Sequence, residues 1–129
     1  MEDSRALTKA LNFLSRSQKS ELETMILSRD SLMPHEIVNK LFITYEQALA
    51  FLLACQLYDF ATTYLLIYHA CTNDKYIESL PFDKGIPDLP FTCENCDEEI
   101  EDIAELSFDV IAYFQKKQKL LVELGRVYE

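Results

Sequence analysis

Residues 34–52, PHEIVNKLFITYEQALAFL, are the stretch that decides the fold. Pro34 fits the first position of a helix, because the N–H that proline lacks would have no partner there. Thr44 and Gln47 have the spacing of a capping box, in which each side chain satisfies the backbone N–H of the other residue. The stretch therefore predicts a short helix opened by Pro34, a tight connection, and a longer helix that follows Thr44 and runs to about Leu57.

The flanking segments extend this pattern in both directions. Apolar residues recur at helical spacing from Ser4 to about Ser15 and again after Ser20, which predicts two more helices. Residues 62–68 are rich in β-branched and aromatic side chains and predict a strand. Residues 106–114 fit a period of two and a helical period about equally, so strand and helix both stay open. Residues 115–125 predict a closing helix.

This order of helices, tight connection, longer helix and hairpin resembles the winged helix-turn-helix superfamily over about residues 18–80. Residues 34–41 correspond to the second helix of that motif, and residues 43–52 supply the turn and the helix in the recognition position. The expected fold class is α+β and mainly helical, with a winged-helix-like core, a β-hairpin, a Cys-x-x-Cys element and a C-terminal helix. We expect one domain over residues 1–129, divided into that core and a region 81–129.

The resemblance implies a helix that reads DNA, and the sequence departs from this expectation. Between Thr44 and Phe60 there is no Lys or Arg, whereas Glu46 and Asp59 are acidic. Base readout in the major groove normally uses Arg, Lys, Asn or Gln, and most nonspecific affinity comes from neutralising phosphates. The sequence therefore favours docking to a protein over docking to DNA.

Acidic residues are concentrated in one part of the chain. The 129 residues carry a formal net charge of −10, and residues 73–109 contain twelve acidic and two basic side chains. Such a surface repels phosphate backbones and favours basic partners, or simply keeps the protein in solution. We interpret the run 97–105 as acids at a helix N-terminus, with Ile100 and Ile103 facing inward.

Three of the four cysteines and one histidine could form a metal site. Cys93 and Cys96 have the two-residue gap of a zinc knuckle, and His69 with Cys71 would complete four ligands. Alternate residues of a strand point the same way, so the second pair is geometrically suited to the task. The sequence leaves two alternatives: the four residues bind one structural zinc ion, or they bind no metal and the thiols are only packed or exposed. Cys55 lies in the most apolar helix and is expected to be a buried small hydrophobe.

Several classes of function are disfavoured. Only two glycines are present, so the chain has no glycine-rich phosphate loop and no glycine inside the acidic run for a calcium loop. Acidic residues directly after Cys96 would raise its pKa and oppose thiol redox catalysis. The first residues lack the pattern of a signal peptide, and no apolar stretch is long enough to cross a bilayer. We expect a cytoplasmic protein that is not an enzyme.

The leading hypothesis is a non-enzymatic adaptor that presents an acidic surface to a protein partner. Exposed aromatic side chains are expected to make the contact, namely Tyr58, Phe60, Tyr64, Tyr68 and Tyr76. A homodimer through the first or last helix is also expected to be compatible with the sequence, because the last helix has an apolar stripe formed by Leu120, Leu121 and Leu124.

Two alternatives stay open. One is a winged-helix transcription regulator that binds DNA through the wing and the N-terminal basic residues Arg5, Lys9, Arg16 and Lys19. The other is an inhibitor from a virus or a defence system that mimics the charge of nucleic acid with residues 73–109.

Overall fold

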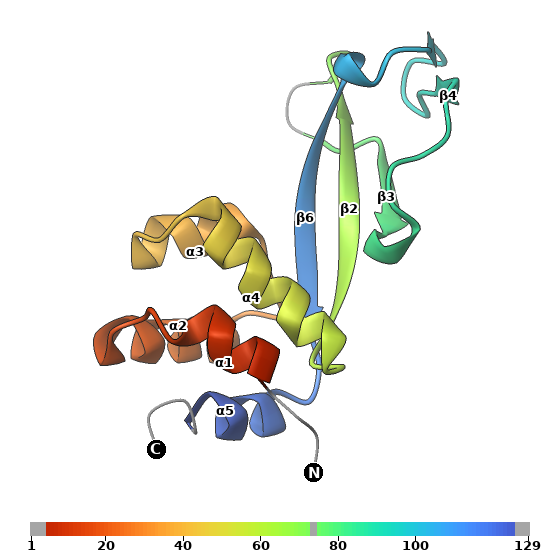
Figure 1. The fold of residues 1–129 in the computed structure, drawn as a ribbon. Helices are drawn as coiled ribbons and strands as arrows, with labels where there is room; N and C mark the ends of the chain where they lie inside the picture. The colour runs from red at the N-terminus through yellow and green to blue at the C-terminus, as the bar shows by residue number, and fades with distance from the viewer. Residues whose placement is uncertain (1–4, 73–74, 126–129) are drawn as a thin grey trace. The chain divides into compact units, whose positions relative to one another are not determined.

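The computed structural model describes residues 5–72 and 75–125 (Figure 1). The helices in this part of the chain are α1 (Arg5–Leu11), α2 (Arg16–Ser28), α3 (Pro34–Leu41), α4 (Tyr45–Leu57) and α5 (Lys117–Gly125). The strands are β1 (Ser31–Leu32), β2 (Ala61–His69), β3 (Glu78–Pro81), β4 (Phe91–Thr92), β5 (Glu99–Ile100) and β6 (Leu106–Phe114). Two short 3-10 helices cover Phe82–Lys84 and Ile103–Glu105.

The strands form two sheets. Four of them make an antiparallel sheet in the order β1-β6-β2-β3, in which Leu32 lies opposite Ala112 and Leu66 opposite Ser79. In Figure 1 the long strands β2 and β6 run side by side. The other two strands, β4 and β5, make a separate hairpin that pairs Phe91 with Ile100.

The prediction of a mainly helical protein is therefore wrong. The structure has 46% helix and 24% strand. Residues 106–114, which fitted both periods, form the strand β6, because pairing with β1 and β2 satisfies its backbone groups. The strands β1, β4 and β5 have two residues each, too few to leave a periodic signal in the sequence.

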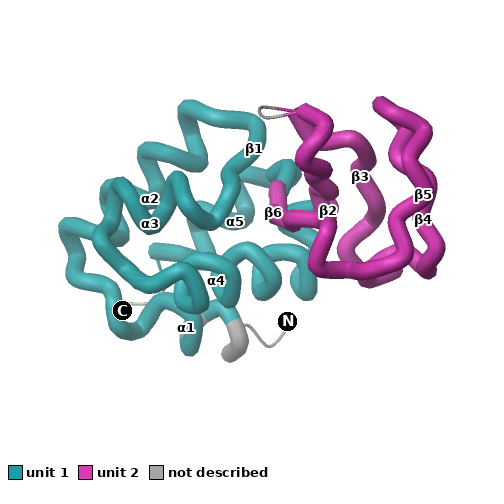
Figure 2. The backbone as a smooth tube through the Cα atoms, turned by 90° about the horizontal axis from the view of Figure 1, so that it is seen from above, with its two compact units in different colours: residues 1–63, 112–129 teal, residues 64–111 magenta. Residues whose placement is uncertain are grey.

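The chain divides into two compact units (Figure 2). Unit 1 consists of residues 1–63 and 112–129, and unit 2 consists of residues 64–111. Each of the long strands β2 and β6 contributes residues to both units. The expectation of one domain over residues 1–129 stays a prediction.

Two capping boxes set the starts of helices in unit 1. The one predicted at α4 is confirmed: the N–H of Gln47 donates to Thr44 Oγ1 at 3.1 Å, and the N–H of Thr44 donates to Gln47 Oε1 at 2.9 Å. A second box, between Ser15 and Gln18, starts α2. The predicted start of that helix at Ser20 is therefore wrong, because the Ser-x-x-Gln pattern five residues earlier caps the backbone at Ser15.

The first and third helices agree with the prediction in type. Pro34 stands in the first turn of α3, as expected. The helix predicted from Ser4 to about Ser15 is α1, which ends at Leu11, and its expected start at Ser4 lies outside the described residues. The closing helix α5 begins two residues later than expected, at Lys117.

An extensive apolar core holds unit 1 together. Its fully or almost fully buried side chains come from all of its helices, among them Leu7, Leu11, Leu22, Ile26, Leu41, Phe51, Leu52, Leu120 and Leu124. Cys55 is also fully buried, which confirms its expected role as a small hydrophobe, and burial raises the pKa of its thiol. Leu120, Leu121 and Leu124 belong to this core or pack against it. The apolar stripe that suggested a homodimer is thus used inside unit 1, and the oligomeric state stays a prediction.

Unit 2 has a much smaller core. Its cluster of buried residues consists of Ile67, Cys93, Ile100 and Leu106, with Ile77, Leu80, Phe91 and Phe108 packed against it. The prediction that the acidic run 97–105 lies at a helix N-terminus is wrong. The run forms β5 and then a short 3-10 turn that the side chain of Asp102 caps, and Ile103 is exposed. Hairpin pairing of Glu99 and Ile100 with β4 overrides the acidic N-terminal signal.

No helix among the described residues has the length and apolar character that a bilayer crossing requires.

Candidate metal centre

The first half of the candidate site comes from the end of β2. His69 is the last residue of that strand, and Cys71 lies in the turn that follows. The turn is closed by the N–H of Thr72, which donates to the carbonyl of His69 at 3.2 Å. The two residues were expected to point the same way along a strand. In the structure Cys71 lies beyond the strand, and the turn brings its side chain back toward His69.

The second half is the tight turn between β4 and β5. The N–H of Cys93 donates to the carbonyl of Glu98 at 2.9 Å, and the N–H of Asp97 donates to the carbonyl of Cys93 at 2.9 Å. Asp97 has φ 64, in the left-handed region that a glycine adopts most easily. Zinc knuckles often carry a glycine after the second cysteine, and here an aspartate takes that conformation, which Asp tolerates better than most residues.

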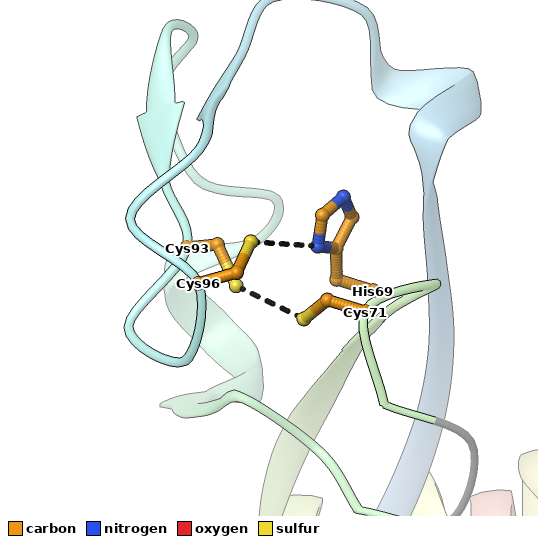
Figure 3. Close-up of side chains that lie close together, drawn as sticks. All are labelled: His69, Cys71, Cys93 and Cys96. Atoms are coloured by element: carbon orange, nitrogen blue, oxygen red, sulfur yellow. Dashed lines mark hydrogen bonds between the residues drawn. The ribbon is translucent and has the colours of Figure 1, made fainter.

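The four side chains converge on one point (Figure 3). One ligand atom from each of His69, Cys71, Cys93 and Cys96 lies within 4.8 Å of all the others. The Sγ atoms of Cys71 and Cys93 are 3.5 Å apart, and Cys96 Sγ is 3.6 Å from His69 Nδ1. Tetrahedral zinc with bonds of about 2.3 Å to sulfur would hold two sulfurs about 3.8 Å apart. The structure thus brings together all four residues that the sequence singled out as metal ligands.

Two further side chains support this group. Glu98 Oε2 lies 3.5 Å from Nε2 of His69, on the side of the ring away from the thiols. The amide Nδ2 of Asn95 donates to Cys71 Sγ at 3.3 Å. A metal-bound histidine usually donates its other ring N–H to a carboxylate or carbonyl, which fixes its tautomer and orientation. Glu98 could not be selected from the sequence, because it is one acid within a long acidic run and nothing in the local pattern distinguishes it.

The cluster is half buried. Cys93 is fully buried and His69 is 7% exposed, whereas Cys71 and Cys96 are exposed. Burial alone would raise the pKa of Cys93, but the backbone amides of Cys96 and Asn95 and the neighbouring thiols outweigh it, and the pKa falls to about 7. The backbone amide of Glu98 acts to lower the pKa of Cys96, but desolvation and the nearby Cys93 and Cys71 thiols raise it to about 11. The neighbouring thiols thus favour ionisation of Cys93 and oppose ionisation of Cys96, and a bound cation would compensate the charge of a second thiolate.

The five aromatic residues predicted to contact a partner differ in their exposure to solvent. Phe60 is buried at 8% exposure in the core of unit 1, so its expected exposure is wrong; it follows α4 directly and its carbonyl accepts from the N–H of Gln115. Tyr58 is partly buried against the same core. In unit 2, Tyr64 and Tyr68 are half-buried and Tyr76 is 52% exposed. The rings of Tyr68 and Tyr76 meet edge to face, with centroids 6.5 Å apart. Their role in binding a partner stays a prediction.

Comparison with protein-family models, with characterised proteins and with solved structures found no match to this chain. The winged helix-turn-helix resemblance therefore stays a prediction.

Proposed function

We propose that this protein is a non-enzymatic protein-docking module whose unit 2 is held together by one structural zinc ion. The observation that carries the proposal is the convergence of one histidine nitrogen and three thiol sulfurs from two separate segments of the chain. The ligands would be His69 Nδ1 and the Sγ atoms of Cys71, Cys93 and Cys96.

The donor set favours zinc. Thiolate and imidazole ligands in a tetrahedral arrangement suit Zn²⁺, whereas calcium and magnesium require oxygen ligands. Glu98 supports the assignment, since a carboxylate behind the far ring nitrogen of His69 would hold the imidazole with Nδ1 toward the ion.

A structural role is favoured over a catalytic one. Catalytic zinc sites use three protein ligands and keep a fourth position for water or substrate, whereas four protein ligands fill a tetrahedral site. The small size of unit 2 also supports a structural role for the metal ion. Unit 2 spans only residues 64–111, and one of the four residues in its buried cluster is the ligand Cys93 itself. Below about 40 residues, domains usually require a metal or disulfides, and unit 2 is close to that limit.

The charge distribution supports docking to protein over docking to DNA. The helix α4, in the recognition position of the motif that this chain resembles, contains no Lys or Arg, and it exposes Tyr45, Glu46 and Leu57 instead. Most acidic side chains of residues 94–105 are exposed in unit 2. Within residues 18–80, the order of helix α2, strand β1, helices α3 and α4 and the antiparallel strands β2 and β3 is compatible with the winged helix-turn-helix resemblance, which we keep as a proposal for this part of the chain.

Metal analysis of the full chain, purified without chelator, tests the zinc part of the proposal. We expect close to one zinc per chain, lost in Cys93→Ser and kept in Cys55→Ala. Cys55 is the matched control, because it is equally buried but belongs to the core of unit 1. A wild-type protein without zinc, or a Cys93→Ser variant that retains it, would contradict the proposal.

A mobility-shift titration with duplex DNA at low salt tests the docking part. We expect no binding beyond the weak background of an acidic protein, since the exposed face of α4 offers no cation to a phosphate. Tight binding that weakens steeply with salt would replace the docking hypothesis with that of a DNA-binding regulator.

A further inference from the structure

The two closest thiols in unit 2 come from different segments of the chain. Cys71 follows β2 and Cys93 ends the β4 arm of the hairpin, 22 positions later, yet their Sγ atoms are 3.5 Å apart. A disulfide has a length of about 2.0 Å, so a movement of about 1.5 Å would join them. Cys71 is exposed and lies in a turn, outside any strand, so its movement would break no ladder hydrogen bond. In Figure 3 the two thiols face one another across the candidate site.

The pairing of the thiols decides what a disulfide would do. A bond between Cys71 and Cys93 joins the turn after β2 to the β4–β5 hairpin, which are the same two segments that a metal ion at the site would join. A bond between Cys93 and Cys96 would close only the turn of the hairpin and leave His69 and Cys71 unattached. Only the first of these crosslinks can take the place of the metal.

We propose that a peroxide exchanges the metal crosslink of unit 2 for a disulfide between Cys71 and Cys93, so that zinc leaves while the two segments stay joined. The release of zinc rests on the function proposed above, whereas the formation of the disulfide and its effect on unit 2 rest on the sulfur geometry alone.

The chemistry balances with the peroxide as oxidant. The exposed Cys71 thiolate attacks one peroxide oxygen, the O–O bond breaks, and Cys71 becomes a sulfenic acid while hydroxide leaves. The Cys93 thiolate then attacks the sulfur of Cys71, the S–S bond forms, and a second hydroxide leaves. Two protons convert the hydroxides to two water molecules. The sulfurs have lost two electrons, the peroxide has gained two, and Zn²⁺ leaves unchanged in charge after losing two thiolate ligands.

The first experiment treats the zinc-loaded full chain with hydrogen peroxide. Zinc release is followed with a zinc-sensitive dye, and the disulfide is located by mass spectrometry of peptides cut under non-reducing conditions. We expect one zinc released for each Cys71–Cys93 disulfide, with Cys55 still a thiol, and full reversal by a thiol reductant with added zinc. Zinc that stays bound, or a disulfide between Cys93 and Cys96, would overturn the proposal.

A pair of variants separates the crosslink from the metal. Cys96→Ser and Cys71→Ser each remove one ligand, but only Cys96→Ser retains the two thiols of the proposed disulfide. Both are exposed cysteines, so neither substitution creates a cavity. After chelation under reducing conditions, amides of residues 64–72 and 75–111 should exchange rapidly in both variants. After peroxide, we expect at least tenfold slower exchange in Cys96→Ser and no change in Cys71→Ser. Equal behaviour of the two variants would contradict the exchange of crosslinks.

The two proposals can fail separately. A wild-type protein that holds no zinc but gains protection in unit 2 through a Cys71–Cys93 disulfide would refute the zinc assignment and leave the disulfide standing. A protein that binds one zinc and loses it to peroxide without that disulfide would refute this inference and leave the structural zinc standing.

Discussion

Units 1 and 2 differ in the size of their buried apolar clusters. Unit 1 has a large cluster of buried leucine, isoleucine and phenylalanine side chains drawn from all of its helices. Unit 2 has four residues in its buried cluster and many more acidic than basic side chains. Its four possible metal ligands, His69, Cys71, Cys93 and Cys96, have ligand atoms within 4.8 Å of one another. Apolar burial is worth roughly 25 cal/mol per Å², so a large core can hold a unit together by itself and a very small one cannot.

Because of this contrast, we expect the two units to respond to different treatments. A unit held by its core responds to changes in packing, whereas a unit held by a metal ion, as we propose for unit 2, responds to metal supply, to thiol chemistry and to the side chains that contact its ligands.

Removal of the metal should affect unit 2 most strongly. Structural zinc sites contribute on the order of 10 kcal/mol of apparent binding free energy at neutral pH, most of which appears as folding free energy. Treating the full chain with a chelator under reducing conditions should make the amides of unit 2 exchange rapidly, while the amides of α2 and α4 stay protected. Hydrogen exchange read by mass spectrometry measures both. Equal loss of protection in both units would show that unit 1 depends on the metal as well.

A cavity in the core of unit 1 should have the opposite effect. Leu52 is fully buried, so Leu52→Ala should lower the free energy of unfolding by about 2–5 kcal/mol while zinc content stays at one per chain. Leu57→Ala on the same helix is the control, because Leu57 is 70% exposed and its truncation should change stability by less than about 0.5 kcal/mol. Denaturant titration gives the free energies. Loss of zinc in Leu52→Ala under native conditions would break the contrast.

Glu98 should tune the metal site without being a ligand. Glu98→Gln should lower the affinity for zinc about 10–100-fold, since it weakens the contact with Nε2 of His69. Glu101→Gln removes the same charge from the same exposed segment and should leave the affinity nearly unchanged. Competition against a chelator of known affinity measures the difference. Equal loss in the two variants would mean that Glu98 acts only through its charge.

The connection between α3 and α4 carries a backbone conformation that its side chain does not favour. Phe42 has φ 60 and is 89% exposed, at the left-handed position that ends α3. Glycine adopts this conformation without the Cβ clash, so Phe42→Gly should be more stable than Phe42→Ala by about 1 kcal/mol. Thermal unfolding of the two variants tests this. An alanine variant as stable as the glycine variant would show that the backbone there is unstrained.

The smallest effect is expected at an exposed ion pair in unit 1. Lys116 Nζ lies 2.7 Å from Asp59 Oδ2, and its hydrogen bond and positive charge hold the pKa of Asp59 below its usual value. A depressed folded-state pKa stabilises the protein above the unfolded pKa, and this contribution is lost as the pH falls through the folded pKa. Asp59→Asn should therefore lower the melting temperature slightly at pH 7, and the difference should disappear in acid. Asparagine also tolerates the φ of 65 at this position. A difference that persists at low pH would point to another cause.

Local signals in the sequence predicted part of this fold correctly. Pro34 and the pair Thr44 and Gln47 act within one helical turn, so the starts of α3 and α4 follow from nearest neighbours alone. The same kind of signal at Ser15 and Gln18 sets the start of α2, five residues before the predicted start at Ser20. Residues 106–114 carry no such local signal, because a strand period and a helix period both fit them. Only the pairing with β1 and β2 decides that they form a strand.

The four side chains of the candidate site could be selected from the sequence. Residue type and spacing selected Cys93 and Cys96, and the need for four ligands selected His69 and Cys71.

The apolar stripe of α5 could not be assigned from the sequence to a core or to a dimer, because that assignment depends on which elements cover the stripe.

Residue type and near neighbours were enough to predict the starts of α3 and α4, the strand β2, the burial of Cys55 and the four side chains of the candidate metal site, since each depends on residues close together in the chain or on chemistry that residue type fixes. The strand character of β6, the position of Glu98 beside His69 and the proximity of Cys71 to Cys93 could be read only from the folded chain. These facts depend on segments far apart in the sequence, which come together only when the backbone hydrogen bonds and the two cores are satisfied at once.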